Sequence, residues 1–91
     1  MKLVLNKCYG GFSLSSDAAR LLHLENDYDE ISRDDPQLIH ILEKYGYAVM
    51  SGEHSLLKIV ELPPTVTDWK IMDYDGYETV IYVLDGKIYH S

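Results

Sequence analysis

Cysteine and basic side chains are scarce in this sequence, and each shortage excludes a class of protein. The single cysteine, Cys8, excludes an intramolecular disulfide framework and every zinc motif built from several cysteines. Only 8 Lys and Arg residues stand against 15 Asp and Glu residues, which gives a formal net charge of −7 at pH 7. Binding to nucleic-acid phosphates requires clustered basic side chains, so we expect no direct binding to nucleic acid.

Long hydrophobic runs are also missing. No apolar run approaches the ~20 residues of a membrane span. The apolar run Leu3-Val4-Leu5 gives way to Asn6 and Lys7, far short of the ~7–15 apolar residues of a signal peptide. We therefore expect a cytoplasmic protein with no membrane partner.

What is present is an ordinary globular composition. Hydrophobic residues make up 46% of the 91 residues and charged residues 25%. These values are typical of a folded domain, and a chain of this length buries enough surface to fold alone. We expect one compact domain over residues 1–91.

Two helices are predicted in the first half of the chain, after a strand at residues 3–5 that is apolar on both faces and so suits the centre of a sheet. The first helix should begin between Ser13 and Ser16, any of which can cap it. Asp35-Pro36 should begin the second helix and Gly46 should end it. The apolar stripes that should face the core are Leu14, Ala18, Leu21 and Leu22 in the first helix, and Leu38, Ile41, Leu42 and Tyr45 in the second.

The second half of the chain is predicted to be β-structure. Strands are expected over residues 56–62, which Pro63-Pro64 should end, and over residues 69–74 and 77–84. Asp75-Gly76 is a strong hairpin signal, and Asp85-Gly86 predicts that the last residues fold back as an edge strand. The β-α-α-β-β-β order predicts an α+β fold, with a mainly antiparallel sheet of about four strands and two helices packed on one face.

Three segments carry a family resemblance. They are the stretch around Asn6-Lys7-Cys8-Tyr9-Gly10-Gly11-Phe12, residues 31–36, and residues 57–63 with Asp73-Tyr74-Asp75-Gly76 after them. Together they resemble small proteins of tailed phages and prophages that open with the Asn-Lys-Cys-Tyr-Gly-Gly-Phe motif. The resemblance implies expression inside an infected bacterial cell and implies no particular activity.

The junction between the first strand and the first helix is a candidate site for a small anionic ligand. Two glycines followed by a serine-capped helix would direct free backbone N–H groups and a positive helix end at an anion such as a phosphorylated nucleotide. The spacing matches neither a P-loop nor the dinucleotide fingerprint, and a purely steric turn is the alternative. The candidate ligand-binding residues are Lys7, Tyr9, Gly10, Gly11, Phe12, Ser13 and Ser15.

An acidic segment at residues 25–35 and the tyrosines of the predicted hairpin are candidates for binding a partner protein. The segment is compatible with a solvated loop or with a surface that mimics nucleic acid, whereas its spacing does not match a calcium loop. We expect Arg33 to pair with Asp34 or Asp35 within it. Tyrosine is enriched at recognition surfaces, and Tyr74, Tyr82 and Met72 are predicted to share one face of the hairpin. The candidate partner-binding residues are Asp27, Asp29, Glu30, Tyr74 and Tyr82.

No catalytic or metal-binding set is predicted. The four histidines are dispersed, none has a spacing that links it to Cys8, and we interpret Cys8 as a small apolar filler. We therefore expect a non-enzymatic protein without a cofactor. The first hypothesis is a phage accessory protein that binds a host protein, for example a basic protein that handles nucleic acid. The alternative is a small-molecule binding protein that uses the junction.

Overall fold

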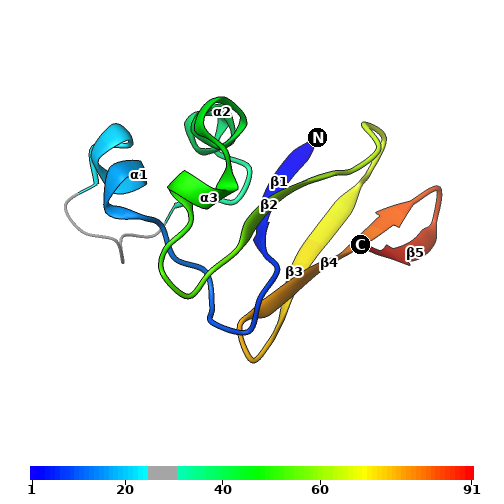
Figure 1. Ribbon diagram of the computed structural model, residues 1–91. Helices are drawn as coiled ribbons and strands as arrows, with labels where there is room; N and C mark the ends of the chain where they lie inside the picture. The colour runs from blue at the N-terminus through cyan, green and yellow to red at the C-terminus, as the bar shows by residue number, and fades with distance from the viewer. Residues whose placement is uncertain (25–30) are drawn as a thin grey trace.

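The computed structural model describes residues 1–24 and 31–91, and Figure 1 shows its helices and strands. The α+β class is confirmed, with three helices and five strands in the described residues. In chain order the elements are β1 (Lys2–Asn6), α1 (Ser16–Leu21), α2 (Pro36–Tyr45), α3 (Tyr47–Met50), β2 (Leu57–Glu61), β3 (Asp68–Tyr74), β4 (Tyr77–Leu84) and β5 (Lys87–His90).

The strands form two antiparallel sheets and not the single sheet predicted from the sequence. β1 pairs with β2, and β3, β4 and β5 form a second sheet in that order. The helices lie over one face of β1–β2, while the second sheet lies on the other side (Figure 1). β1 is therefore buried on both faces, as its sequence predicts, because it is the middle layer of three.

Two hydrophobic clusters separate these layers, and β1 contributes to both. Val4 belongs to the cluster under the helices, together with Leu38 of α2 and Leu57 of β2. Leu3 and Leu5 point the other way, into the cluster shared with Val80 of β4. Successive side chains of a strand point to opposite faces, so a run of three apolar residues serves both interfaces.

The helix boundaries follow their capping residues. The Asp35 carboxylate accepts hydrogen bonds from the N–H groups of Gln37 and Leu38, and Gly46, at φ +86°, ends α2. Ser15 caps α1, which ends after six residues. Leu21 and Tyr45 were predicted to face the core, but both are exposed. The four-residue helix α3 was not predicted. None of the helices in the described part of the chain is long and apolar enough to span a membrane.

Two tight turns connect the strands of the second sheet. Asp75 and Gly76 have φ values of +51° and +90°, and Asp85 and Gly86 have values of +52° and +76°. Positive φ at both central residues is the type I′ geometry that suits two-residue hairpins, and Asp-Gly is a favoured sequence for it. Both turns predicted from the sequence are confirmed.

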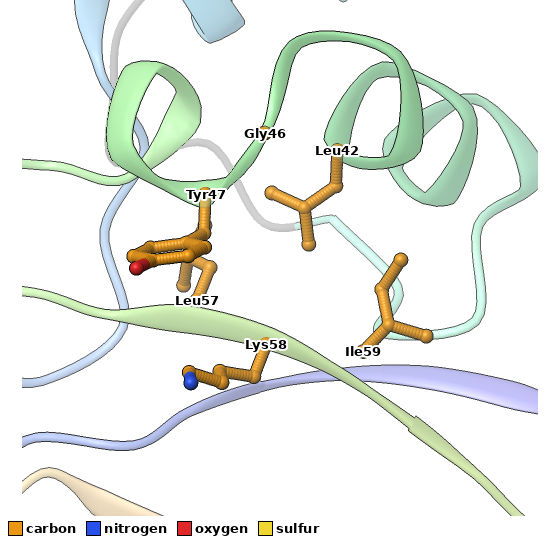
Figure 2. A pocket seen from close by; sticks show the side chains of 6 residues that line it. All are labelled: Leu42, Gly46, Tyr47, Leu57, Lys58 and Ile59. Atoms are coloured by element: carbon orange, nitrogen blue, oxygen red, sulfur yellow. The ribbon is translucent and has the colours of Figure 1, made fainter.

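A hollow of about 200 Å³ opens between the helices and β2. Figure 2 shows its lining, with Leu42, Gly46 and Tyr47 on the helical side and Leu57, Lys58 and Ile59 on the strand. Leu42 and Leu57 are buried and form the floor, whereas Tyr47 is half exposed at the rim.

Candidate functional site

The junction predicted to bind an anion packs against the β3–β4 hairpin. The Lys7 ammonium group donates a hydrogen bond to the Glu78 carbonyl oxygen at 2.7 Å and lies 5.1 Å from the centre of the Tyr77 ring. The exposed Tyr9 ring packs on the same Tyr77 ring, with 5.4 Å between ring centres. Partial burial lowers the pKa of the Lys7 amine, and the nearby Glu78 charge opposes this shift.

Gly10 and Gly11 are required by close packing and backbone conformation. A Cβ atom at Gly10 would lie 1.6 Å from the carbonyl oxygen of His54. Gly11 has open space around its Cβ position, but its φ of +89° favours glycine. A Cβ atom at Gly76, on the hairpin turn, would lie 2.4 Å from the Gly11 nitrogen. The two glycines therefore let the N-terminal segment lie directly against His54 and the hairpin tip.

The remaining residues of the junction also have partners within the chain. The Phe12 ring lies under the Arg33 guanidinium group, 3.6 Å from ring centre to guanidinium carbon. The Ser13 carbonyl accepts a hydrogen bond from the Ser55 hydroxyl, and the Ser15 hydroxyl caps α1. All seven predicted ligand residues thus have structural contacts, and ligand binding at the junction stays a prediction.

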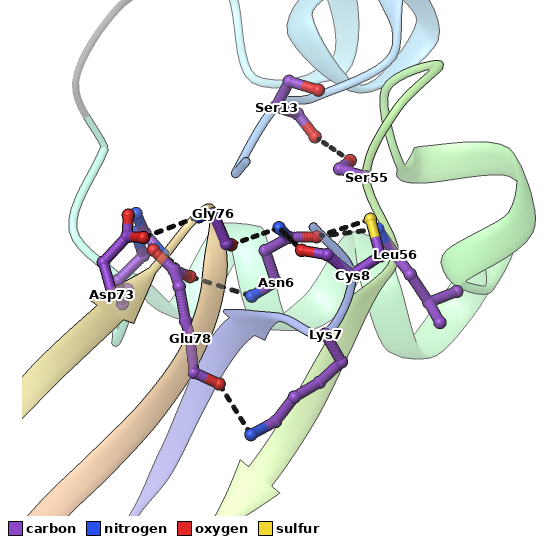
Figure 3. A network of polar contacts seen from close by, with 10 residues as sticks. Asn6, Lys7, Cys8, Ser13, Ser55, Leu56, Asp73, Gly76 and Glu78 are labelled. Atoms are coloured by element: carbon purple, nitrogen blue, oxygen red, sulfur yellow. Dashed lines mark hydrogen bonds and ion pairs between the residues drawn. The ribbon is translucent and has the colours of Figure 1, made fainter. Parts of the chain in front are cut away.

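Asn6 connects the segments of this junction, although it was not among the predicted site residues. Its side chain is fully buried, and its amide nitrogen donates to the carbonyl oxygens of Cys8 at 2.8 Å and Gly76 at 2.6 Å. Its amide oxygen accepts from the Leu56 N–H group at 2.8 Å. Figure 3 shows this network, in which one side chain connects the end of β1, the start of β2 and the hairpin turn.

A buried ion pair closes the edge of β1 that faces away from β2. Arg33 pairs with Glu78, not with Asp34 or Asp35 as predicted, and the Glu78 side chain is only 4% exposed. The same Glu78 carboxylate accepts the backbone N–H of Asn6, and the Arg33 carbonyl accepts the N–H of Val4. Thus a carboxylate and a carbonyl satisfy the donors that a third strand would otherwise pair.

The tyrosines predicted to share one face of the hairpin lie on opposite faces. The register pairs Tyr74 with Tyr77 and Trp69 with Tyr82, so Tyr82 shares a face with Trp69 and packs on the core cluster around Leu3 and Leu5. It also stacks on Tyr89. Tyr74 lies with Met72 on the opposite face. The prediction of a shared face is therefore wrong for Tyr82.

We call the side of the second sheet that faces away from β1 and β2 the outer face. Its apolar and aromatic side chains are Met72, Tyr74, Tyr77, Ile81, Val83 and Ile88. Tyr74 and Ile88 are 73% and 70% exposed, which is unusual for side chains of this size. The register pairs Val83 with Ile88, so these two apolar side chains are neighbours across β4 and β5, and Lys70 and Thr79 share the same face.

The second sheet also carries more negative than positive charge. Residues 68–90 contain five carboxylates (Asp68, Asp73, Asp75, Glu78 and Asp85) and two lysines (Lys70 and Lys87). Asp73 accepts the N–H of Gly76 and so contributes a hydrogen bond to the turn. The acidic candidates Asp27, Asp29 and Glu30 lie outside the described residues.

Within residues 1–24 and 31–91, no three His, Cys, Asp or Glu side chains lie close enough together to hold a metal ion. The half-buried Cys8 thiol donates to the His54 carbonyl oxygen at 3.0 Å. No family model matches this chain, and neither do the curated proteins or solved structures with which it was compared.

Proposed function

We propose that this chain is a non-enzymatic binding protein whose partner is another protein, bound through the outer face of the second sheet. The observation that carries the proposal is the exposed apolar surface formed by Met72, Tyr74 and Ile88. Single apolar residues are normal on a surface, but several large apolar side chains exposed on one face are typical of an interaction site. Tyrosine and methionine are also enriched at protein–protein interfaces.

The charge of the molecule supports a basic partner. The formal net charge is −7, and the carboxylates of Asp68, Asp75 and Asp85 belong to the sheet that carries the outer face. Opposite charges accelerate the encounter of two proteins, whereas buried apolar contacts supply most of the affinity. With the phage resemblance, this favours a basic protein of the host bacterium as the partner.

The proposal is tested by comparing two variants in parallel. A Tyr74→Ser/Ile88→Ser double variant should lose a partner that the wild-type protein captures from a bacterial lysate, because both side chains would be buried in the complex. Leu21→Ser is the control, because Leu21 is also an exposed apolar residue, at 41%, and it lies on α1, away from the outer face. Mass spectrometry identifies the partner, and purified proteins then give the affinity.

Association kinetics test the electrostatic part separately. The association rate with the purified partner should fall as salt rises from about 50 to 500 mM, because surface charges are screened over this range. A partner retained equally by the double variant and by wild type would contradict the proposed surface. Unchanged association across this salt range would contradict only the role of charge.

A further inference from the structure

β2 has a backbone edge that no strand pairs. The Lys7 N–H donates to the Leu56 carbonyl oxygen, and the Leu62 N–H donates to the Met1 carbonyl oxygen. The even-numbered residues from 56 to 62 therefore direct their backbone groups toward β1. Backbone groups alternate in direction along an antiparallel strand, and therefore those of Leu57, Ile59 and Glu61 point away from β1. The Leu57 N–H is bonded to the Ser51 hydroxyl at 2.9 Å. Among the described residues, nothing pairs with Ile59 or Glu61 at this edge.

The hollow lies directly beside this open edge. Its strand side is Leu57, Lys58 and Ile59, and its helical side is formed by Leu42, Gly46 and Tyr47 (Figure 2). A strand added beside β2 would place alternate side chains toward the helices. A volume of about 200 Å³ accommodates one apolar side chain of leucine or phenylalanine size.

The two ends of the edge carry opposite charges. At the Leu57 end, the Lys58 ammonium group lies 5.2 Å from the centre of the Tyr47 ring. At the other end, Glu61 lies opposite Lys2, whose own ion pair is made with Glu43 at 2.7 Å. A ligand that spans the edge is therefore complementary when it has an acidic group near Lys58 and a basic group near Glu61.

We infer that the free edge of β2 binds an extended peptide segment of another protein as a third strand, with one apolar side chain in the hollow. Main-chain hydrogen bonds to Ile59 and Glu61 would hold the peptide, and the hollow would select the side chain. This surface is separate from the outer face and belongs to the other sheet. The inference therefore stands independently of the proposed function.

The charges and the sheet geometry together define the peptide. Antiparallel pairing is slightly more stable per residue than parallel pairing, so the peptide should run opposite to β2, with its N-terminal end near Glu61. Its lysine then faces Glu61, its apolar residue faces Ile59 and the hollow, and its glutamate lies beside Lys58. A suitable probe is the fluorescently labelled peptide Thr-Lys-Thr-Leu-Glu-Thr, acetylated and amidated at its ends.

Two comparisons on the protein test where the peptide binds. Tyr47→Ala removes one wall of the hollow, whereas Tyr45→Ala removes a similarly exposed tyrosine outside it. Glu61→Pro removes an outward N–H and the carboxylate, whereas Glu61→Gln removes only the charge. Proline is tolerated at a strand edge when its missing N–H faces solvent, and Glu61 is exposed at the end of β2. Thermal melting of each variant checks that the fold is retained.

We expect about tenfold weaker peptide binding for Tyr47→Ala and for Glu61→Pro, and a smaller loss for Glu61→Gln. Tyr45→Ala and the outer-face variant Ile88→Ser should bind as wild type does. A second peptide, N-methylated at the amides that face β2, should bind at least tenfold more weakly than the first. In NMR spectra, the amide signals of Ile59 and Glu61 should shift when the unmodified peptide is added.

Several outcomes overturn the inference. One is no binding of the peptide at about 1 mM, and another is equal binding of its N-methylated form. Equal losses for Tyr45→Ala and Tyr47→Ala would likewise exclude the hollow as the binding site. A dimer of this chain that Glu61→Pro converts to monomers would show that a second copy, and not a foreign peptide, pairs with β2.

Discussion

Glu78 contributes more contacts to the interior than any pattern in the sequence indicates. One carboxylate receives the Arg33 guanidinium group and the Asn6 N–H, and the carbonyl of the same residue receives the Lys7 ammonium group. A carboxylate at 4% exposure is costly unless its charge is paired and its lone pairs are bonded. Both conditions are met here, so the stability of this region should depend strongly on the partner of Glu78.

We therefore expect Arg33→Ala to lower the free energy of unfolding by about 3 kcal/mol, because it leaves a buried carboxylate without its cation. It also removes the guanidinium group that covers Phe12. The measurement is urea denaturation at pH 7. Arg20→Ala is the control, because its ion pair with Asp17 is exposed and should contribute less than about 1 kcal/mol. Similar losses for the two variants would mean that the Arg33–Glu78 pair contributes little.

Lys7 should titrate below the ordinary lysine range. Burial disfavours its charged form, so its pKa is lowered in the folded protein despite the nearby Glu78 charge. The unfolded chain then binds this proton more tightly than the folded chain does. The charged amine therefore costs stability below its folded pKa, and this cost disappears as pH rises past the ordinary lysine pKa.

The measurement is an NMR titration of the lysine side chains, in the folded protein and in strong urea. The Lys7 midpoint should be lower in the folded protein and return to the ordinary lysine value in urea. A midpoint higher in the folded protein than in urea would mean that attraction to Glu78 outweighs burial.

At the scale of the elements, the two Asp-Gly turns form a natural comparison. Gly76 and Gly86 occupy the same turn position with positive φ, but only Gly76 packs against Gly10 and Gly11. Gly86→Ala should cost about 1 kcal/mol from backbone strain alone. Gly76→Ala should cost roughly 2 kcal/mol more, because its methyl group would overlap a backbone that cannot easily move.

Thermal or chemical denaturation of both variants measures this difference. Because the turn geometry is shared, the difference reports the packing of the hairpin tip on the N-terminal segment. Equal losses for the two variants would show that the hairpin tip can move away from Gly11 at little cost.

Local signals in the sequence predicted the elements but not how they assemble. Asp35-Pro36, Gly46 and both Asp-Gly turns act on their own neighbours, so their effects are visible in a short window of sequence. The split into two sheets depends on contacts between residues far apart, such as Asn6 with Gly76. A single turn of helix such as α3 is too short to show a periodicity.

The error over Tyr82 was avoidable from the sequence. A two-residue turn at Asp75-Gly76 pairs Tyr74 with Tyr77, and each step away from the turn pairs one residue from each strand. Even-numbered residues of β3 therefore lie beside odd-numbered residues of β4. The prediction grouped residues by number alone, and so placed Tyr82 on the wrong face.

At the scale of the whole molecule, β1 joins the two hydrophobic clusters into one unit. Val4 packs under the helices, while its neighbours Leu3 and Leu5 pack against the second sheet. If β1 separated from either cluster, apolar side chains of both clusters would be exposed to solvent. We therefore expect the protein to unfold in one cooperative step.

The single tryptophan makes this testable. Trp69 packs against the cluster of the second sheet, whereas far-UV circular dichroism reports the helices above the other cluster. Thermal unfolding followed by tryptophan fluorescence and by circular dichroism should give the same midpoint. Two separate midpoints would mean that the sheets and the helices unfold independently.

The long separation between β1 and β2 has a consequence for synthesis of the chain. Residues 7–56 lie between these two paired strands, whereas β3, β4 and β5 are joined by two-residue turns. Contacts between distant residues form slowly because a large loop must close first, so the three-stranded sheet should form early and β1–β2 late. During synthesis, β1 leaves the ribosome before its partner strand β2 has been made. Leu3, Val4 and Leu5 therefore stay exposed to solvent until β2 emerges. The strand at the centre of the finished protein is therefore the part of the nascent chain most in need of protection from aggregation.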